Sequence, residues 1–126
     1  MKNITKSLIG LLGLQFILGM LASFYQEVSV DDPGSVFQHF GFILVHSLVA
    51  IVILMLSAVL LWMSFRARYQ IKNAMWGLAG IVVAFITGHL FVATQNDIYS
   101  LIMAVGFLVS FGLYIYRATI DRNTAS

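Results

Sequence analysis

The stretch FGFILVHSLVAIVIL, residues 40–54, decides how this chain folds. It is apolar apart from His46 and Ser47, and it lies inside a longer segment, residues 38–65, that has no Asp, Glu, Lys or Arg. A hydrocarbon core about 30 Å thick is crossed by about 20 helical residues, so this segment is long enough to span a membrane. An imidazole buried there is costly unless it finds a polar partner. The stretch therefore predicts a membrane-spanning helix, and it makes the partner of His46 the first question about function.

The composition agrees with a membrane protein. The chain has 126 residues, of which 60% are hydrophobic and only 10% are charged, and its mean hydropathy is +0.94. A soluble domain carries about 25% charged residues, so this chain has too little polar surface to cover itself in water. The length fits one domain, residues 1–126. The absence of cysteine excludes disulfides, thiol nucleophiles, iron–sulfur clusters and cysteine-based zinc sites.

Hydropathy divides the chain into four apolar segments. They are residues 7–24, 38–65, 73–94 and 98–116. The connections between them are short, and the sequence QND joins the third to the fourth, with Asn96 or Asp97 as the expected helix cap. Short connections force consecutive helices to lie antiparallel. The predicted fold is therefore an all-α, up-down bundle of four transmembrane helices.

The charges predict an orientation. The seven basic residues all fall on one side of such a bundle: Lys2, Lys6, Arg66, Arg68, Lys72, Arg117 and Arg122. The opposite side receives Glu27, Asp31, Asp32 and Asp97. The positive-inside rule then places both termini in the cytoplasm of a bacterial cell, with the chain in the cell membrane. The basic residues are interpreted as topology signals and lipid headgroup contacts, and not as a nucleic-acid surface.

The first 24 residues resemble a signal peptide in having basic residues before an apolar run. Their apolar run is longer than the usual 7–15 residues or so of a signal peptide, and Leu21-Ala22-Ser23 is a poor cleavage site. We therefore expect a retained span.

The third segment carries small residues at helical spacing. Gly77, Gly80, Ala84 and Gly88 form a nearly continuous ridge along one face. Small residues allow close helix contacts in membranes, where lipid provides no hydrophobic drive for association. The ridge predicts a tight helix–helix interface.

Two histidines fall at similar depths in the outer half of the predicted bundle. By the helical rise, His46 lies roughly 9 Å below Phe40, and His89 lies roughly 6 Å below Ala93. Because their helices are antiparallel neighbours, we expect His46 to meet His89, either across a haem iron or another metal or through a shared polar contact. His39 shares the helix face of His46 and is expected at the outer surface, as an interfacial polar residue.

Two methionines complete this layer. Met20 and Met103 fall at about the same depth on the first and fourth segments, and both haem iron and copper accept His and Met ligands. Other interpretations stay open: methionine is a common gap-filler in helix packing. His46 has an alternative too, a hydrogen bond to a backbone carbonyl, to Ser47 or to a glutamine across the bundle. Gln15, in the middle of the first segment, is expected to bond between helices.

Three segments resemble a known family. LQFILGMLASFY, DPGSVFQHFGFILVHSLVAIVIL and FVATQNDIYSLIMAVGFLVSFGLYIY are similar to a widespread, uncharacterised family of small four-helix bacterial membrane proteins. The resemblance covers most of the chain and rests on a glycine in the first segment, on the VHSLVA segment at His46, and on Asn-Asp-x-x-Ser-x-x-Met-Ala at residues 96–104. A weaker, architectural likeness is to membrane b-type cytochromes and to one half of haem A synthase. That likeness implies haem b held between His46 and His89.

Three functions therefore compete. The first is haem b or metal binding between the second and third spans, with a redox or haem-handling role. The second is a cofactor-free accessory subunit or interaction module of a larger membrane complex or homo-oligomer. A carrier for a small solute or metal ion is the third, and it is less favoured because the inner halves offer few polar residues beyond Ser57, Ser64 and Asn73. Enzymatic activity has little support, since no catalytic acid, nucleophile or phosphate-binding loop is visible.

Overall fold

The chain forms long helices throughout its described part. The computed structural model describes the backbone of residues 1–28 and 33–123 and the side chains of residues 1–21 and 41–123. The helices are α1 (Lys2–Val28), α2 (Pro33–Ala67), α3 (Ile71–Thr94) and α4 (Asp97–Asn123). All four are long and apolar enough to cross a membrane. The prediction of a helical chain with four membrane-length helices is confirmed for these residues.

The helices are longer than the apolar segments that predicted them. Helix α1 begins at Lys2, five residues before the predicted span, and α4 continues to Asn123, past the predicted end at residue 116. Hydropathy detects only the apolar part of a helix. The polar turns at its ends stay helical because their residues still complete the backbone hydrogen bonds.

The two described links are tight turns. Arg68 and Gln70, between α2 and α3, and Gln95, after α3, all adopt left-handed backbone conformations. The Gln95 N–H donates to the Phe91 carbonyl, which closes the last turn of α3. The Asn96 side chain then accepts a hydrogen bond from the Ile98 N–H, so Asn96 caps the start of α4 as one of the two expected residues.

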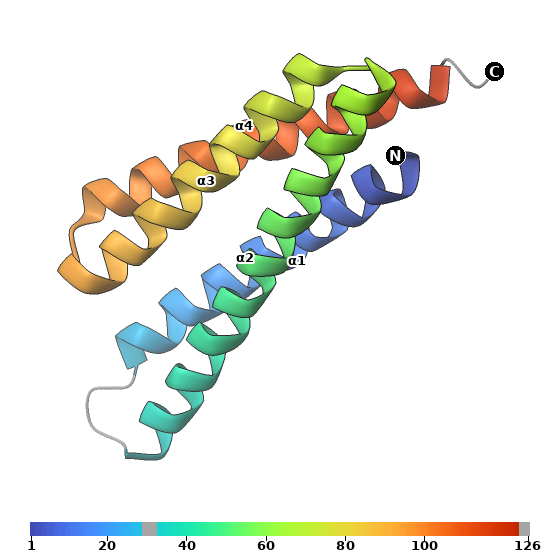
Figure 1. Ribbon diagram of the computed structural model, residues 1–126. Coiled ribbons are helices and arrows are strands. Elements are labelled where there is room, and N and C mark those ends of the chain that lie inside the picture. The colour runs from blue at the N-terminus through green and yellow to red at the C-terminus, as the bar shows by residue number, and fades with distance from the viewer. Residues whose placement is uncertain (29–32, 124–126) are drawn as a thin grey trace.

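The helices form two antiparallel hairpins, α1–α2 and α3–α4 (Figure 1). Each helix contacts its two neighbours in the order α1–α2–α3–α4–α1. The hairpins lie together at the end that holds the two termini and the α2–α3 link, which we call the basic end. They diverge toward the opposite end, which holds the end of α1, the start of α2 and the α3–α4 link and which we call the far end (Figure 1). The bundle is therefore closed at the basic end, and its two hairpins are splayed at the far end.

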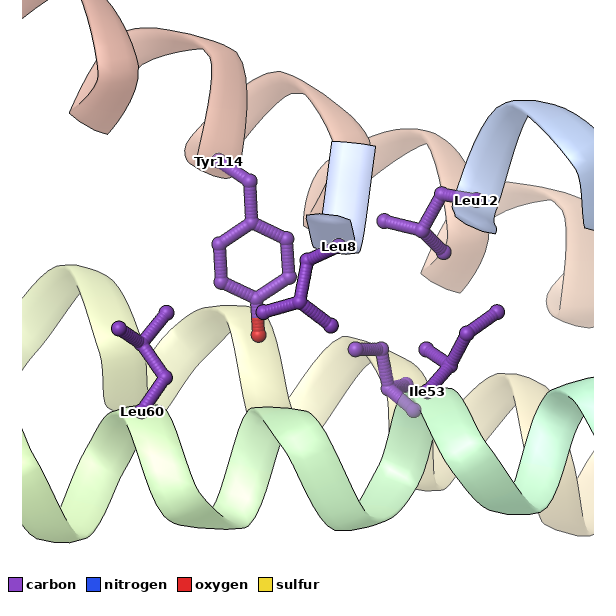
Figure 2. Close-up of a cluster of buried hydrophobic side chains, with 6 residues drawn as sticks. Leu8, Leu12, Ile53, Leu60 and Tyr114 are labelled. Carbon is purple, nitrogen blue, oxygen red and sulfur yellow. The ribbon is translucent and has the colours of Figure 1, made fainter. Parts of the chain in front are cut away.

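The core lies in the half of the bundle next to the basic end. Its buried apolar residues are Leu8, Leu12, Ile53, Leu60, Ile81 and Tyr114. Figure 2 shows the Tyr114 side chain reaching from α4 toward α2 and α3, with the leucines and the isoleucine around it. Phe16 of α1 stacks on Phe107 of α4 with ring centroids 5.8 Å apart, which joins the two hairpins on the far side of this core.

The predicted ridge of small residues is the α3–α4 interface. A Cβ atom added at Gly80 would lie 2.8 Å from the Gly106 carbonyl oxygen, and one added at Gly77 would lie 2.7 Å from the Tyr114 ring. The Ser110 hydroxyl donates across this interface to the Gly77 carbonyl, at 2.9 Å. At Gly80 the two backbones approach so closely that only glycine fits, and at Gly77 the missing side chain makes room for the Tyr114 ring.

Candidate functional site

His46 contacts a glutamine of the neighbouring helix. The Gln15 amide nitrogen of α1 lies 3.0 Å from His46 Nε2 and donates to the His46 backbone carbonyl at 3.1 Å. Gly19, one turn along α1 from Gln15, makes room for the ring, because a Cβ atom there would lie 3.3 Å from His46 Cε1. The interpretation in which His46 bonds a glutamine across the bundle, and Gln15 bonds between helices, is confirmed.

This contact assigns roles to the two ring nitrogens of His46. An amide N–H can only donate, so Nε2 accepts and the proton lies on Nδ1. Within the described residues, His46 Nδ1 and the Gln15 amide oxygen are both buried without a hydrogen-bond partner. The pair thus leaves one donor and one acceptor unused at this depth.

His89 has a different environment. It is exposed, its Nδ1 lies 2.9 Å from the Phe85 carbonyl oxygen, and its ring packs on the Phe85 ring at 4.5 Å between centroids. The carbonyl can only accept, so Nδ1 carries the proton and Nε2 keeps a free lone pair. This is the arrangement that metal-ligating histidines commonly have.

The four residues of the expected ligand layer each have separate surroundings. His46 faces α1 and His89 is exposed, Met20 is 60% exposed, and Met103 packs against Gly88 of α3. Among the described side chains, no group of three or more His, Cys, Asp or Glu is placed to hold a metal ion. His39 lies outside the described side chains.

The surroundings of His46 and His89 show whether a haem could be held between their two imidazoles. His89 presents a free nitrogen, as an axial ligand must. His46 does not fit in this arrangement, because Nε2 accepts from Gln15 and Nδ1 is protonated and buried beside Gly19. The described residues therefore supply one of the two expected axial ligands.

A second polar cluster lies at the basic end and was not predicted from the sequence. Arg117 is fully buried, although it was expected to contact lipid headgroups with the other basic residues, and that expectation is wrong for Arg117. Its guanidinium donates to the Gln70 carbonyl at 3.3 Å, approaches the Met1 sulfur at 3.5 Å, and lies 5.8 Å from the centre of the Tyr69 ring. Hydropathy ended the fourth span one residue too early to count Arg117 as part of the packed helix. Its spacing of three residues from Tyr114, on the same helix face, was the available signal.

Hydrogen bonds connect this cluster to the α2–α3 link. The Tyr69 hydroxyl donates to the Asp121 carboxylate at 3.0 Å, and the Gln70 amide donates to the Tyr69 oxygen at 2.9 Å. Arg117 Nε remains buried without a partner in the described part of the chain. The cluster holds the start of α1, the α2–α3 link and the end of α4 together, so it stabilises the closed end of the bundle.

Comparisons with models of protein families, with curated proteins and with solved structures found no match for this chain.

Proposed function

We propose that this chain is an accessory subunit of a bacterial membrane complex and that its far end receives a transmembrane helix of a partner protein. The observation that carries the proposal is the arrangement of the hairpins, which are held together by the core and the Arg117 cluster at the basic end and diverge at the far end (Figure 1). The splayed ends of the two hairpins contact each other less than their joined ends do, so we propose this end as the place where a further helix packs.

The unused polar atoms support a protein partner in preference to lipid. The His46 Nδ1 donor and the Gln15 oxygen acceptor lie in the half of the bundle that opens, and an unpartnered polar group in hydrocarbon is costly. Acyl chains offer no hydrogen bond, whereas a helix carrying a hydroxyl or amide side chain does. The expected partner is therefore an apolar helix with one such side chain at this depth. Because both atoms are buried in the unbound chain, docking requires the Gln15 or His46 side chain to rotate toward the partner.

Site-directed cross-linking in native membranes tests the proposal. A photo-reactive residue at Met20, exposed on α1 near the far end, is expected to give one adduct of defined mass, and the same residue at Val59, exposed on α2 in the closed half, is expected to give none. The adduct should weaken in Gln15→Leu and His46→Leu. Equal adducts from both positions would contradict the proposal, and an adduct made only of two copies of this chain would replace the partner protein with a homo-oligomer.

The proposed orientation places both termini and the basic end in the cytoplasm. All seven basic residues support it, because they lie in the turns of the four helices at this end or in the α2–α3 link. A reporter fused after Ser126 is expected to be active only in its cytoplasmic form, and a reporter inserted at residues 27–32 only in its exported form. The reverse pattern would overturn the orientation without bearing on the fold.

Haem b or metal binding is the second candidate, with a redox or haem-handling role. The free Nε2 of His89 favours it, since the Phe85 carbonyl holds the ring in a ligand-ready tautomer. Protein expressed with ample haem and metal and purified in detergent should then show a haem absorption band or bound metal that His89→Ala removes. Colourless, metal-free protein would eliminate this candidate.

A further inference from the structure

A shallow, largely open pocket at the basic end combines apolar walls with one arginine. It has a volume of about 290 Å³ and is lined by Met1, Trp62, Met63, Arg66 and Ala67. The Arg66 guanidinium lies over the Trp62 ring, 5.7 Å from its centre. Both side chains belong to the last turns of α2, where a membrane-spanning helix emerges from the bilayer.

The charges around this pocket are strongly one-sided. Arg117, fully buried, contacts the Met1 sulfur and so places a second guanidinium behind the pocket wall. Within the described part of the chain, Asp121 is the one acidic residue at this end, where its carboxylate accepts a hydrogen bond from Tyr69 and interacts electrostatically with Arg117. Asp121 therefore offsets part of the Arg117 charge, and Arg66 provides the positive charge in the pocket lining.

We propose that this pocket binds the headgroup of an anionic phospholipid. A guanidinium presents parallel N–H donors that match the oxygens of a phosphate. The indole and the methionine side chains offer an apolar surface for the first part of the acyl chains. A free phosphate ion would use Arg66 alone, whereas an anionic lipid uses both the charge and the apolar lining, and only the lipid accounts for the whole pocket.

The two tryptophans of the chain allow a direct test. Trp62 lines the pocket, Trp76 does not, and the two are 61% and 62% exposed. Trp76→Phe leaves Trp62 as the only tryptophan, and Trp62→Phe leaves Trp76, so selective excitation of tryptophan reports on one position at a time. Each variant is reconstituted in phosphatidylcholine vesicles that contain an equal minor fraction of brominated phosphatidylglycerol or of brominated phosphatidylcholine, whose bromine atoms quench nearby indoles.

The expected result is a preference at Trp62 alone. Brominated phosphatidylglycerol should quench Trp62 more strongly than brominated phosphatidylcholine does, while Trp76 should be quenched equally by both. One basic residue near an anionic membrane surface contributes about 1 kcal/mol, so Arg66→Ala should lower the apparent lipid preference about fivefold. Lys72→Ala, which removes an exposed charge of the same end outside the pocket, should leave most of the preference.

Three outcomes would overturn the proposal. They are equal quenching of Trp62 by the two lipids, an equal loss of preference in Arg66→Ala and Lys72→Ala, and complete loss of preference when inorganic phosphate is added, which would indicate a site for the free ion. Native mass spectrometry of the unsubstituted chain and of the two charge variants, with each lipid in turn, gives the same comparison without altering either tryptophan.

Discussion

The two hairpins are held together by different chemistry. Along α3 and α4 the contact is between backbones, where Gly80 and Gly106 face each other and a Cβ atom on either would meet the carbonyl of the other at 2.8 Å. Between α1 and α2 the defining contact is a side-chain hydrogen bond, from Gln15 to His46. The first interface excludes substitution by its geometry, and the second depends on two polar groups that find each other in an apolar environment.

This difference predicts which hairpin responds to a partner at the far end. A glycine interface needs close contact along its length, and the α3–α4 pair keeps it from Gly77 to Gly88. A single polar contact holds two helices at one level and leaves their other faces available. The α1–α2 hairpin is therefore the one whose stability we expect to respond to a partner helix at the far end.

The largest effect is expected from Gly106→Ala. The new methyl group would lie 2.8 Å from the Gly80 oxygen and 3.3 Å from the Ala84 nitrogen, and both are backbone atoms that cannot move aside separately. Overpacking of this kind costs about 1–3 kcal/mol, which unfolding in mixed detergent micelles, followed by circular dichroism, would measure. Gly112→Ala is the control on the same helix, because a Cβ atom there meets no described atom within 4 Å. Helix propensity alone would stabilise both variants, because alanine is favoured over glycine inside a helix. Equal losses in the two variants would therefore contradict the assignment of the effect to the α3–α4 interface.

The next effect concerns the Gln15–His46 pair. A double-mutant cycle of Gln15→Ala and His46→Ala should give a coupling energy of about 0.6–1.7 kcal/mol, the range found for hydrogen bonds between membrane helices. A second cycle, of Gln15→Ala with His89→Ala, is the matched control. It should be additive, because His89 bonds only within its own helix. A coupling near zero in the first cycle would mean that the pair does not hold α1 to α2.

The α3–α4 and α1–α2 interfaces could not be predicted equally well from the sequence. The lengths of the apolar segments and the shortness of their links predicted the four helices, and the spacing of Gly77, Gly80 and Gly88 predicted a close contact. Such features are local, because each is decided within one helix or one link. The close contact at the ridge could be predicted without knowing which helix packs there, since any neighbouring helix can approach small residues closely.

The partner of His46 could not be predicted in the same way. The helical rise gives a residue's depth, but its contacts also depend on how each helix is rotated and on which neighbour it faces. His46 and His89 matched in depth, yet His46 faces α1 and His89 is exposed. Gln15 was recognised as a bonding residue without its partner being identified. Arg117 was missed because polar turns beyond the apolar segment stay helical and pack.

A smaller effect should separate two buried serines. The Ser110 hydroxyl lies 2.9 Å from the Gly77 carbonyl across the interface and 2.9 Å from the Gly106 carbonyl of its own helix, whereas Ser64 donates to Leu60 of its own helix. Both serines are fully buried. Ser110→Ala is expected to cost about 0.6 kcal/mol, the average for a polar contact between membrane helices, and Ser64→Ala less than this, because its hydroxyl bonds within its own helix. The same micelle unfolding assay measures both. An equal or larger loss in Ser64→Ala would contradict a stabilising role for the Ser110–Gly77 hydrogen bond.

The smallest effect is expected from His89→Ala, which should change the free energy of unfolding by less than about 0.5 kcal/mol, as substitutions away from packed features do. Its hydrogen bond runs to the Phe85 carbonyl of the same helix, and its ring is exposed. His46→Ala, by contrast, leaves the Gln15 amide without its ring partner and should destabilise the bundle measurably.

Measuring the free energy of unfolding of both variants with and without added haem distinguishes the two histidines further. Equal destabilisation by the two variants in the absence of haem would contradict the separate environments of the two histidines and would restore a shared contact between them. A destabilisation by His89→Ala that appears only with haem would instead assign His89 a ligand role, because a ligand that binds only the folded state adds stability that the variant then loses.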